Sequence, residues 1–307
     1  MGLFKGLYSE RSRGQQLLLF LMIWMFFYFI FNVLSGAFMF LFTDIRNLEN
    51  LNNIYSDPSY SSALRYFQLV LSIGIFVIPP LVFAYLASDD PYRFLKIRHW
   101  PEPLLIILGI LIVFAASPVM YAFLDLNQSI TFPESLKGLE QTLREMEEST
   151  NSLIERMLSM DTPLDLLLNL AVIAVIPALG EELLFRGGIQ QLLHRWTQRP
   201  HLAIILAGIL FSFIHFQFFG FLPRMLLGIL FGYLFYWSGN LWLPILAHFF
   251  YNASQVMMVY LSDREIIETN VKQVEHVPLS MVLPSAILLT LLLIVFYKLA
   301  HRSRGMV

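Results

Sequence analysis

Eight runs of mostly apolar residues constrain the fold more than any other feature of the sequence. Each is close to the ~20 residues that a helix needs to cross a hydrocarbon core of ~30 Å. We therefore predict an all-α, polytopic membrane helical bundle of about eight transmembrane helices. The runs cover residues 16–43, 65–88, 103–124, 164–193, 200–219, 221–238, 241–261 and 279–298.

The composition excludes an ordinary soluble domain. Hydrophobic residues make up 57% and charged residues 14% of the 307 positions, whereas soluble chains average roughly 45–50% apolar and 25% charged residues. The net charge of −2 offers no basic field for nucleic acid. Because the chain has no cysteine, disulfides and cysteine-based sites are excluded too. We expect contact with membrane lipids, no nucleic acid partner, and a multi-pass location in a bacterial plasma (inner) membrane.

The charge of the loops alternates along the chain. The N-terminal segment, the loops 93–98 and 195–199, and the C-terminal tail are basic. In contrast, 125–162 carries eight acidic residues against three basic ones, and 262–278 is acidic as well. Since basic loops stay in the cytoplasm, we predict that the N- and C-termini are both cytoplasmic.

The loop between the third and fourth runs is long enough to be structured. Its apolar residues recur near a 3.6-residue period, which predicts an amphipathic, extracytoplasmic helix within 134–160. This helix either rests on the bilayer and the neighbouring spans or acts as a lid over a substrate. The apolar positions are Leu136, Leu139, Leu143, Met146, Leu153, Ile154 and Met157.

No internal repeat divides the chain. We predict a single membrane domain over 1–307, with three N-terminal spans in 1–125, a core of spans in 163–261 and a last span at 279–298.

Away from their ends, most of the predicted spans carry no ionisable residue, and the exceptions gather in three spans of the second half. An ionisable group at the centre of an isolated membrane helix costs at least ~2.5–3.5 kcal/mol, so each one needs a reason. Three polar residues elsewhere, Asn32, Asp165 and Arg224, are interpreted as interfacial. The clustered residues are Glu181, Glu182 and Arg186 from 164–193, His215 from 200–219, and His248 and Asn252 from 241–261.

Spacing indicates what these residues can do. Glu182 and Arg186 are four residues apart with the acid first, the favourable order for a helical ion pair. Glu181 lies about 100° around the helix from Glu182, so it can face a cavity while Glu182 faces Arg186. As the carboxylate without its own cation, Glu181 suits a general base. His248 and Asn252 lie one turn apart and can direct two hydrogen-bond donors at one oxygen.

Structural roles are the alternative for each of these residues. Glu182 and Arg186 could form a buried ion pair without function, a lone histidine in a span commonly makes a helix–helix hydrogen bond, and Asn252 could do the same. Three polar sets on three spans favour a shared site. Counted from the cytoplasmic ends at ~1.5 Å per residue, however, His248 is shallower than Glu181 or His215. The spans must tilt, or the turn at 238–240 must dip inward.

Three short motifs resemble the pattern of the CAAX prenyl protease and bacteriocin-processing family, also called the Abi family of intramembrane proteases. They are Glu181-Glu182-x-x-x-Arg186, Phe211-x-x-x-His215 and His248-x-x-x-Asn252. The resemblance covers residues 166–255, and nothing upstream of about 160 is diagnostic. It implies an all-α membrane fold, a cavity that opens within the bilayer, and hydrolysis of a peptide bond.

The resemblance also implies a role for each motif residue. Glu181 with His215 would activate the attacking water, and His248 with Asn252 would stabilise the oxyanion. Glu182, Arg186 and Phe211 would support them. The implied substrate is a protein or peptide cleaved within or close to the membrane. Eukaryotic members cut near the C-terminus of prenylated proteins, a specificity that we do not transfer.

Members of this family are often labelled metalloproteases. Glu181, His215 and His248 could hold zinc with one position open, but the sequence has no His-Glu-x-x-His helix. We expect chemistry without a metal, because His248 and Asn252 already offer an oxyanion hole. Zinc is the alternative.

Two other functions remain open from the sequence. The chain could be a non-catalytic membrane scaffold or a bacteriocin self-immunity protein of the same fold. It could also be a proton-coupled transporter with the buried Glu and His residues as a relay. Against transport, the first three spans carry no counterpart of the polar cluster, as inverted repeats would require.

Overall fold

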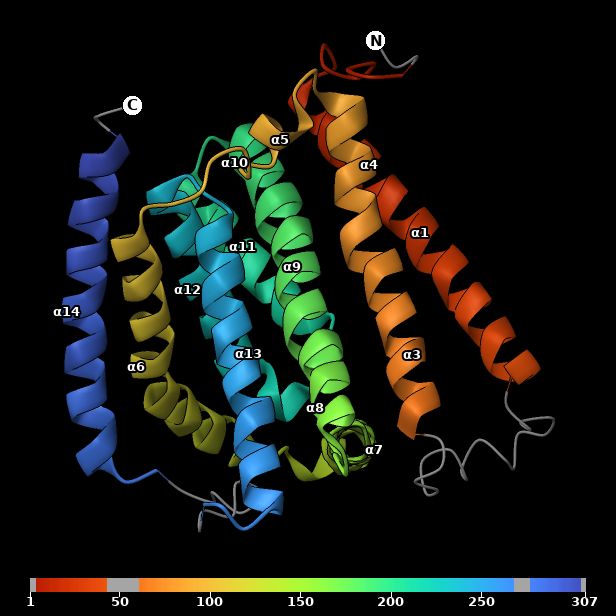
Figure 1. The fold of residues 1–307 in the computed structure, drawn as a ribbon, viewed down its shortest axis with the longest axis vertical. Helices are drawn as coiled ribbons and strands as arrows, with labels where there is room; N and C mark the ends of the chain where they lie inside the picture. Colours follow the sequence, from red (N-terminus) through yellow and green to blue (C-terminus); the bar gives the residue numbers. More distant parts are fainter. Residues whose placement is uncertain (1–3, 43–60, 268–276, 305–307) are drawn as a thin grey trace.

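The protein is described by a computed structural model that covers residues 4–42, 61–267 and 277–304. Within these ranges every regular element is a helix, which confirms the all-α class. Figure 1 shows long helices side by side, with the described ends of the chain, near residues 4 and 304, at the same end of the bundle.

The first helices form one edge of the bundle, where α1 packs against α3 and α4. A π-helical stretch, η2, joins α3 to α4 into one continuous rod. The elements are α1 (Arg13–Phe42), α3 (Ser61–Ser72), η2 (Ile73–Val77), α4 (Ile78–Ala87) and the short α5 (Pro91–Phe94).

The opposite edge is formed by α6 (Pro103–Gln128) and α14 (Leu279–Arg304), which pack along each other. Both α12 and α13 contact α6 from the inner side. A buried cluster that includes Ile112, Phe231 and Phe296 joins these layers.

The centre of the bundle is built from the chain between 163 and 263. Its first part runs as one long rod in which two π-helical stretches flank the Glu181–Glu182 pair. The central elements are α8 (Pro163–Asn169), η4 (Leu170–Val175), α9 (Ile176–Glu182), η5 (Leu183–Gln190), α10 (Gln191–Thr197), α11 (Pro200–Phe213), η6 (Phe218–Gly220), α12 (Phe221–Ser238) and α13 (Trp242–Asp263).

Prolines follow two of the π-helical stretches. Pro79 and Pro80 lie at the start of α4 directly after η2, and Pro177 lies at the start of α9 directly after η4. Proline has no backbone N–H, so the carbonyl four residues earlier loses its α-helical donor. The rods therefore leave regular α geometry close to these positions.

Six helical segments in the described ranges are long and apolar enough to cross a membrane. Of the eight predicted spans, 200–219 contains the shorter helix α11 of 14 residues, and 241–261 corresponds to α13, which has 22 residues but is not among the six. A polytopic helical bundle is thus supported, while the count of eight stays a prediction. The six segments are Arg13–Phe38, Ser61–Ala87, Pro103–Gln128, Pro163–Thr197, Phe218–Ser238 and Leu279–Arg302.

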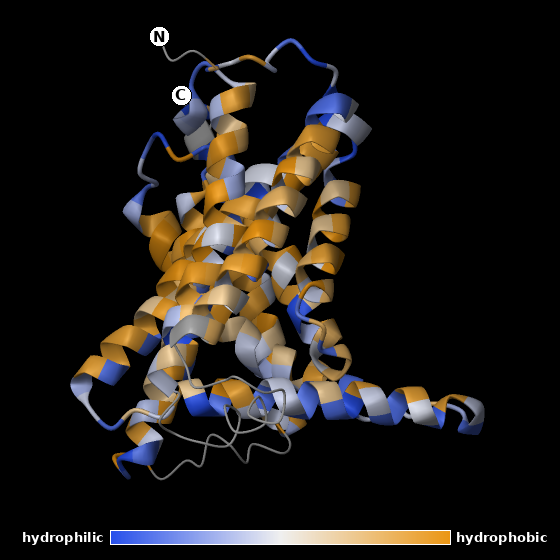
Figure 2. Cartoon of the chain, turned by 90° about the vertical axis from the view of Figure 1, so that its right-hand side faces the viewer, coloured by the Kyte–Doolittle hydropathy of each residue, from blue (hydrophilic) through white to orange (hydrophobic). Residues whose placement is uncertain are grey.

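The amphipathic helix predicted within 134–160 is present as η3 (Glu134–Leu136) and α7 (Lys137–Met157). It is seen end-on in Figure 1 and lengthwise in Figure 2, where it lies across one end of the bundle with hydrophilic and hydrophobic residues alternating along it. Both chain ends, α5 and α10 lie at the other end. This division matches the alternation of loop charge, and the cytoplasmic side stays a prediction. Residues 268–276 of the acidic loop 262–278 lie outside the described ranges.

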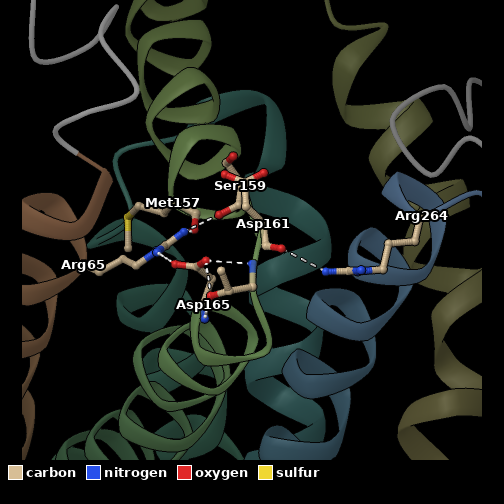
Figure 3. A network of polar contacts seen from close by, with 7 residues as sticks. Arg65, Met157, Ser159, Asp161, Asp165 and Arg264 are labelled. Carbon is tan, nitrogen blue, oxygen red and sulfur yellow. Dashed lines mark hydrogen bonds and ion pairs between the residues drawn. The ribbon is translucent and has the colours of Figure 1, made fainter.

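A polar network fixes the joint between α7 and α8 (Figure 3). The Arg65 side chain of α3 is 4% exposed and pairs with Asp165 at 2.6 Å. It also donates to the carbonyl oxygens of Met157 and Ser159. Arg264, just after α13, donates to the carbonyl oxygen of Asp161 at 3.1 Å. Asp165 is therefore more than an interfacial residue, because it links α8 to α3.

Candidate active site

One cavity of about 290 Å³ brings together the four residues predicted to be catalytic. Its walls include Glu181 from α9, His215 just after α11, and His248 and Asn252 from α13. Three helical segments that are separate in the sequence thus meet at one space, as the shared-site hypothesis requires.

The ion pair expected from the spacing of Glu182 and Arg186 is present and completely buried. Arg186 Nη1 lies 2.7 Å from Glu182 Oε1, and both side chains are 0% exposed. Arg186 Nη2 also donates to the carbonyl oxygen of Gly228 in α12 at 2.6 Å. A buried charge needs this kind of compensation, so the pair ties the helix of the two glutamates to α12.

The close approach of α11 and α12 makes that contact with Gly228 feasible. A Cβ atom on Gly228 would lie 3.1 Å from the Cα atom of Gly208 and 3.1 Å from the ring of Phe211. Small residues at a helix crossing allow backbones to approach. Here they bring the Gly228 carbonyl oxygen to Arg186 and the Phe211 ring to within 4.9 Å of its guanidinium carbon.

His248 connects the two glutamates. Its Nδ1 lies 3.0 Å from Glu182 Oε1, and its Nε2 lies 3.9 Å from Glu181 Oε2. Because an ionised carboxylate only accepts hydrogen bonds, the Nδ1 atom carries a hydrogen toward Glu182. The Nε2 atom is then directed at the cavity beside Glu181, and it can donate there when the ring is an imidazolium.

Aromatic rings hold the His248 imidazole in place. Phe231 stacks on it with ring centroids 4.9 Å apart and an interplanar angle of 20°. Phe211 meets it edge-on at 6.1 Å. The side chain is only 4% exposed, so its orientation is set by packing as well as by Glu182.

Asn252 is anchored to the rod that carries the glutamates. Its Nδ2 donates to the carbonyl oxygen of Ile173 at 3.0 Å. Ile173 lies four residues before Pro177, which has no N–H to donate to this oxygen. Asn252 supplies a donor in its place, and the second hydrogen of its amide group remains for a ligand in the cavity.

His215 has a defined tautomer. Its Nδ1 lies 2.8 Å from the carbonyl oxygen of Phe211, one turn earlier in the chain. A carbonyl oxygen only accepts, so Nδ1 carries the hydrogen and Nε2 of the neutral ring is left as an acceptor. The Phe211 ring also packs beside His215 with centroids 5.3 Å apart. His215 can therefore accept a hydrogen bond from a water molecule in the cavity.

The turn before α13, at 238–240, is expected to dip inward if His248 is to reach Glu181 and His215, and the chain next to it is buried. Leu241 is fully buried, and its N–H donates to the carbonyl oxygen of Lys96 at 3.1 Å. Asn240 Nδ2 and Trp242 Nε1 donate to carbonyl oxygens of the same loop at 2.8 and 3.0 Å. The loop after α5 thus covers the turn, and α13 begins inside the bundle. From this start, His248 reaches Glu182.

The structure adds cavity residues that the sequence did not single out. Arg224, interpreted above as interfacial, lines the cavity, as do Tyr121 and Tyr251. Tyr251 stands three residues after His248 within the third motif, so its place on the same helix face could have been recognised from spacing. Tyr121 gives no local signal, since α6 approaches α13 only through the tertiary fold.

The described residues contain no group of three His, Cys, Asp or Glu side chains placed to hold a metal ion. Glu181, His215 and His248, the set considered for zinc, line one cavity without forming such a group. The Nδ1 atoms of both histidines are engaged by Glu182 and by the Phe211 carbonyl oxygen, which leaves Nε2 of each ring for a ligand. Chemistry without a metal stays a prediction, and zinc stays the alternative.

Comparison with known proteins finds a family that the central part of the chain resembles. The model of the Rce1-like family, described as type II CAAX prenyl endopeptidase Rce1-like, matches residues 163–254. The comparisons with curated proteins and with solved structures found no match. The matched region runs from the start of α8 into α13 and contains all three motifs. Residues 163–254 of this polytopic membrane protein are therefore similar to the Rce1-like family of type II CAAX prenyl endopeptidases.

Proposed function

We propose that the chain is an intramembrane endopeptidase that hydrolyses a peptide bond with a water molecule activated by Glu181 and His215. The observation that carries this proposal is the single cavity lined by Glu181, His215, His248 and Asn252. Similarity to the Rce1-like family over the same residues supports it.

In the proposed mechanism, His215 Nε2 accepts a hydrogen bond from the water and Glu181 removes its proton. The water oxygen attacks the carbonyl carbon of the scissile bond. Glu181 then returns the proton to the amide nitrogen as the C–N bond breaks, which yields a carboxylic acid and an amine. A general base of this kind contributes typically ~10²–10⁴-fold to the rate.

His248 and Asn252 stabilise the negative charge that forms on the carbonyl oxygen. In this proposal His248 donates from Nε2 as an imidazolium, while its Nδ1 stays bonded to Glu182 at 3.0 Å. Asn252 donates the amide hydrogen that Ile173 leaves free. Loss of one oxyanion donor typically costs ~2.7–4 kcal/mol of barrier, so these donors matter as much as the base.

The test is incubation of the purified protein in detergent with a library of membrane-inserting peptides. Product profiles of the wild type and of Glu181→Ala are compared by mass spectrometry. We expect new peptide termini with the wild type that the variant does not produce. Identical profiles would contradict the peptidase and favour a non-catalytic scaffold.

A further inference from the structure

Arg224 is a cation in the cavity that makes no direct ion pair with a described acidic residue. It lies in the first turn of α12 and lines the cavity together with Glu181 and His215. Among the described residues, no carboxylate oxygen comes within 4.0 Å of its guanidinium. Ionisable groups at membrane depth generally pair with each other or mark a ligand path. Arg186 shows the first case in this molecule, and Arg224 lacks that pairing.

The guanidinium of Arg224 is held in a fixed position. Its Nη2 donates to Gln217 Oε1 at 2.6 Å, and its Nη1 donates to the Gln217 carbonyl oxygen at 3.3 Å. Gln217 is oriented in turn, because its Nε2 donates to Asn151 Oδ1 of α7 at 2.9 Å. The anchor is therefore neutral, and the nearby acidic side chains Glu147 and Glu181 attract Arg224 without forming an ion pair with it within 4.0 Å.

Gly220 makes room for this arrangement. A Cβ atom on Gly220 would lie 2.7–2.9 Å from three atoms of the Arg224 guanidinium. The backbone of Gly220 has φ −108° and ψ 7°, which other residues can adopt, so what glycine provides here is space for the guanidinium in its present position. The guanidinium lies against a bare backbone and faces the cavity that both residues line.

Three donors of Arg224 remain available to a ligand. A guanidinium has five N–H groups, and the two bonds to Gln217 engage two of them. A planar fork of such donors matches the geometry of a carboxylate, which it can bind with two parallel hydrogen bonds. Peptides offer carboxylates at the C-terminus and on Asp and Glu side chains.

We propose that Arg224 binds a carboxylate of the peptide substrate and thereby decides which peptides are cleaved. This inference rests on the proposed peptidase function. With a volume of about 290 Å³, the cavity lies near the lower end of ligand pockets, ~300–1,000 Å³. A carboxylate held by Arg224 would therefore lie close to the bond that Glu181 and His215 attack.

Four pools of lipid-anchored decapeptides with randomised positions test this proposal. Two pools end in a carboxylate and two in a carboxamide, and within each type one pool contains Asp and Glu while the other has Asn and Gln instead. Cleavage by the wild type, Arg224→Gln and Arg224→Lys is followed by mass spectrometry. Arg199→Gln, which removes an exposed arginine between α10 and α11 that is not among the cavity residues, is the matched control.

We expect the wild type to prefer one acidic pool over its amide counterpart by about 10–100-fold, the effect of hydrogen bonds to a charged group. Which pair of pools shows the preference tells a terminal carboxylate from a side-chain one. Arg224→Gln should reduce the ratio to about 1 while still cleaving the amide pool. Arg224→Lys should keep part of the preference, and Arg199→Gln all of it.

Other outcomes would overturn the inference. If Arg224→Gln lowered cleavage of all four pools equally, Arg224 would act on Glu181 or on the loop before α12, and the peptidase would stand. If the wild type cleaved no pool, the proposed function would fail. Binding of the pools to Glu181→Gln, measured as depletion from solution, then decides whether Arg224 recognises a carboxylate. Equal binding of acid and amide pools would end the proposal.

Discussion

Glu182 offers the sharpest test of how the site is held together. Its carboxylate is the only acidic partner described for Arg186, and both side chains are 0% exposed. In the Glu182→Leu variant, Arg186 keeps the Gly228 carbonyl oxygen at 2.6 Å and the faces of Phe211 and Phe231 at 4.9 and 5.5 Å. These contacts do not neutralise its charge, so the variant retains a buried, uncompensated cation.

Removing one partner of a buried ion pair costs about 3–5 kcal/mol of unfolding free energy. For Glu182→Gln we expect the low end of that range, because the amide oxygen still accepts a hydrogen bond from Arg186. The double variant Glu182→Leu, Arg186→Met should recover at least half of the loss, since replacing both charges by apolar groups is often close to neutral. The double variant should therefore fold. It should be inactive, because His248 lacks the Glu182 carboxylate that orients its Nδ1.

Unfolding by denaturant in mixed micelles measures these free energies. Glu155→Gln, which changes an exposed glutamate on α7, should stay within about 0.5 kcal/mol of the wild type. The reasoning is refuted if the double variant is as unstable as the sum of its single variants. In that case the charges of Glu182 and Arg186 would not be coupled.

Three further outcomes are expected. Reporter fusions should place 93–98, 195–199 and the C-terminal tail in the cytoplasm and 134–160 outside, and a cytoplasmic 134–160 would reverse the topology. Replacement of Arg65 by Ala should lower the unfolding free energy by about 3 kcal/mol, because Asp165 loses its cation and two carbonyl oxygens lose a donor. An unchanged denaturation midpoint would show that the joint of α7 and α8 does not depend on Arg65. Chelator-treated, metal-free protein should keep its cleavage activity, and recovery that requires added zinc would show that water activation by Glu181 and His215 alone is wrong.

Much of the architecture can be predicted from local sequence patterns, because their geometry does not depend on the rest of the fold. Apolar runs indicate the long helices, the 3.6-residue period indicates α7, and the i,i+4 order of Glu182 and Arg186 indicates their ion pair. These predictions depend on short-range geometry, and the structure contains all three features. The number of spans and the side of the membrane on which each loop lies depend on the bilayer as well as on the chain. Both stay predictions.

Features that arise from tertiary contacts could not be read in this way. Ile173 becomes an acceptor for Asn252 because Pro177 removes a helical donor, a consequence that appears only when α13 lies beside η4. The buried turn at Leu241 depends on the loop after α5, which is more than a hundred residues away in the sequence. Arg224 resembles an interfacial arginine in the sequence because it stands at a helix start, and only the packing of α12 places it in the cavity.

Single-turnover cleavage by Glu181→Gln tests the central claim most directly. Glu181 lines the cavity, and within the described ranges the one basic group that lies within 4.0 Å of it is His248 at 3.9 Å, so we expect the fold to depend little on its charge. We predict a cleavage rate lower by ~10²–10⁴-fold or more, with peptide binding little changed and an unfolding free energy equal to or above that of the wild type. A variant that cleaves at the wild-type rate would contradict the role of Glu181 as the base. If Glu181→Gln unfolded while Glu182→Gln stayed folded and inactive, the roles of the two glutamates would be reversed.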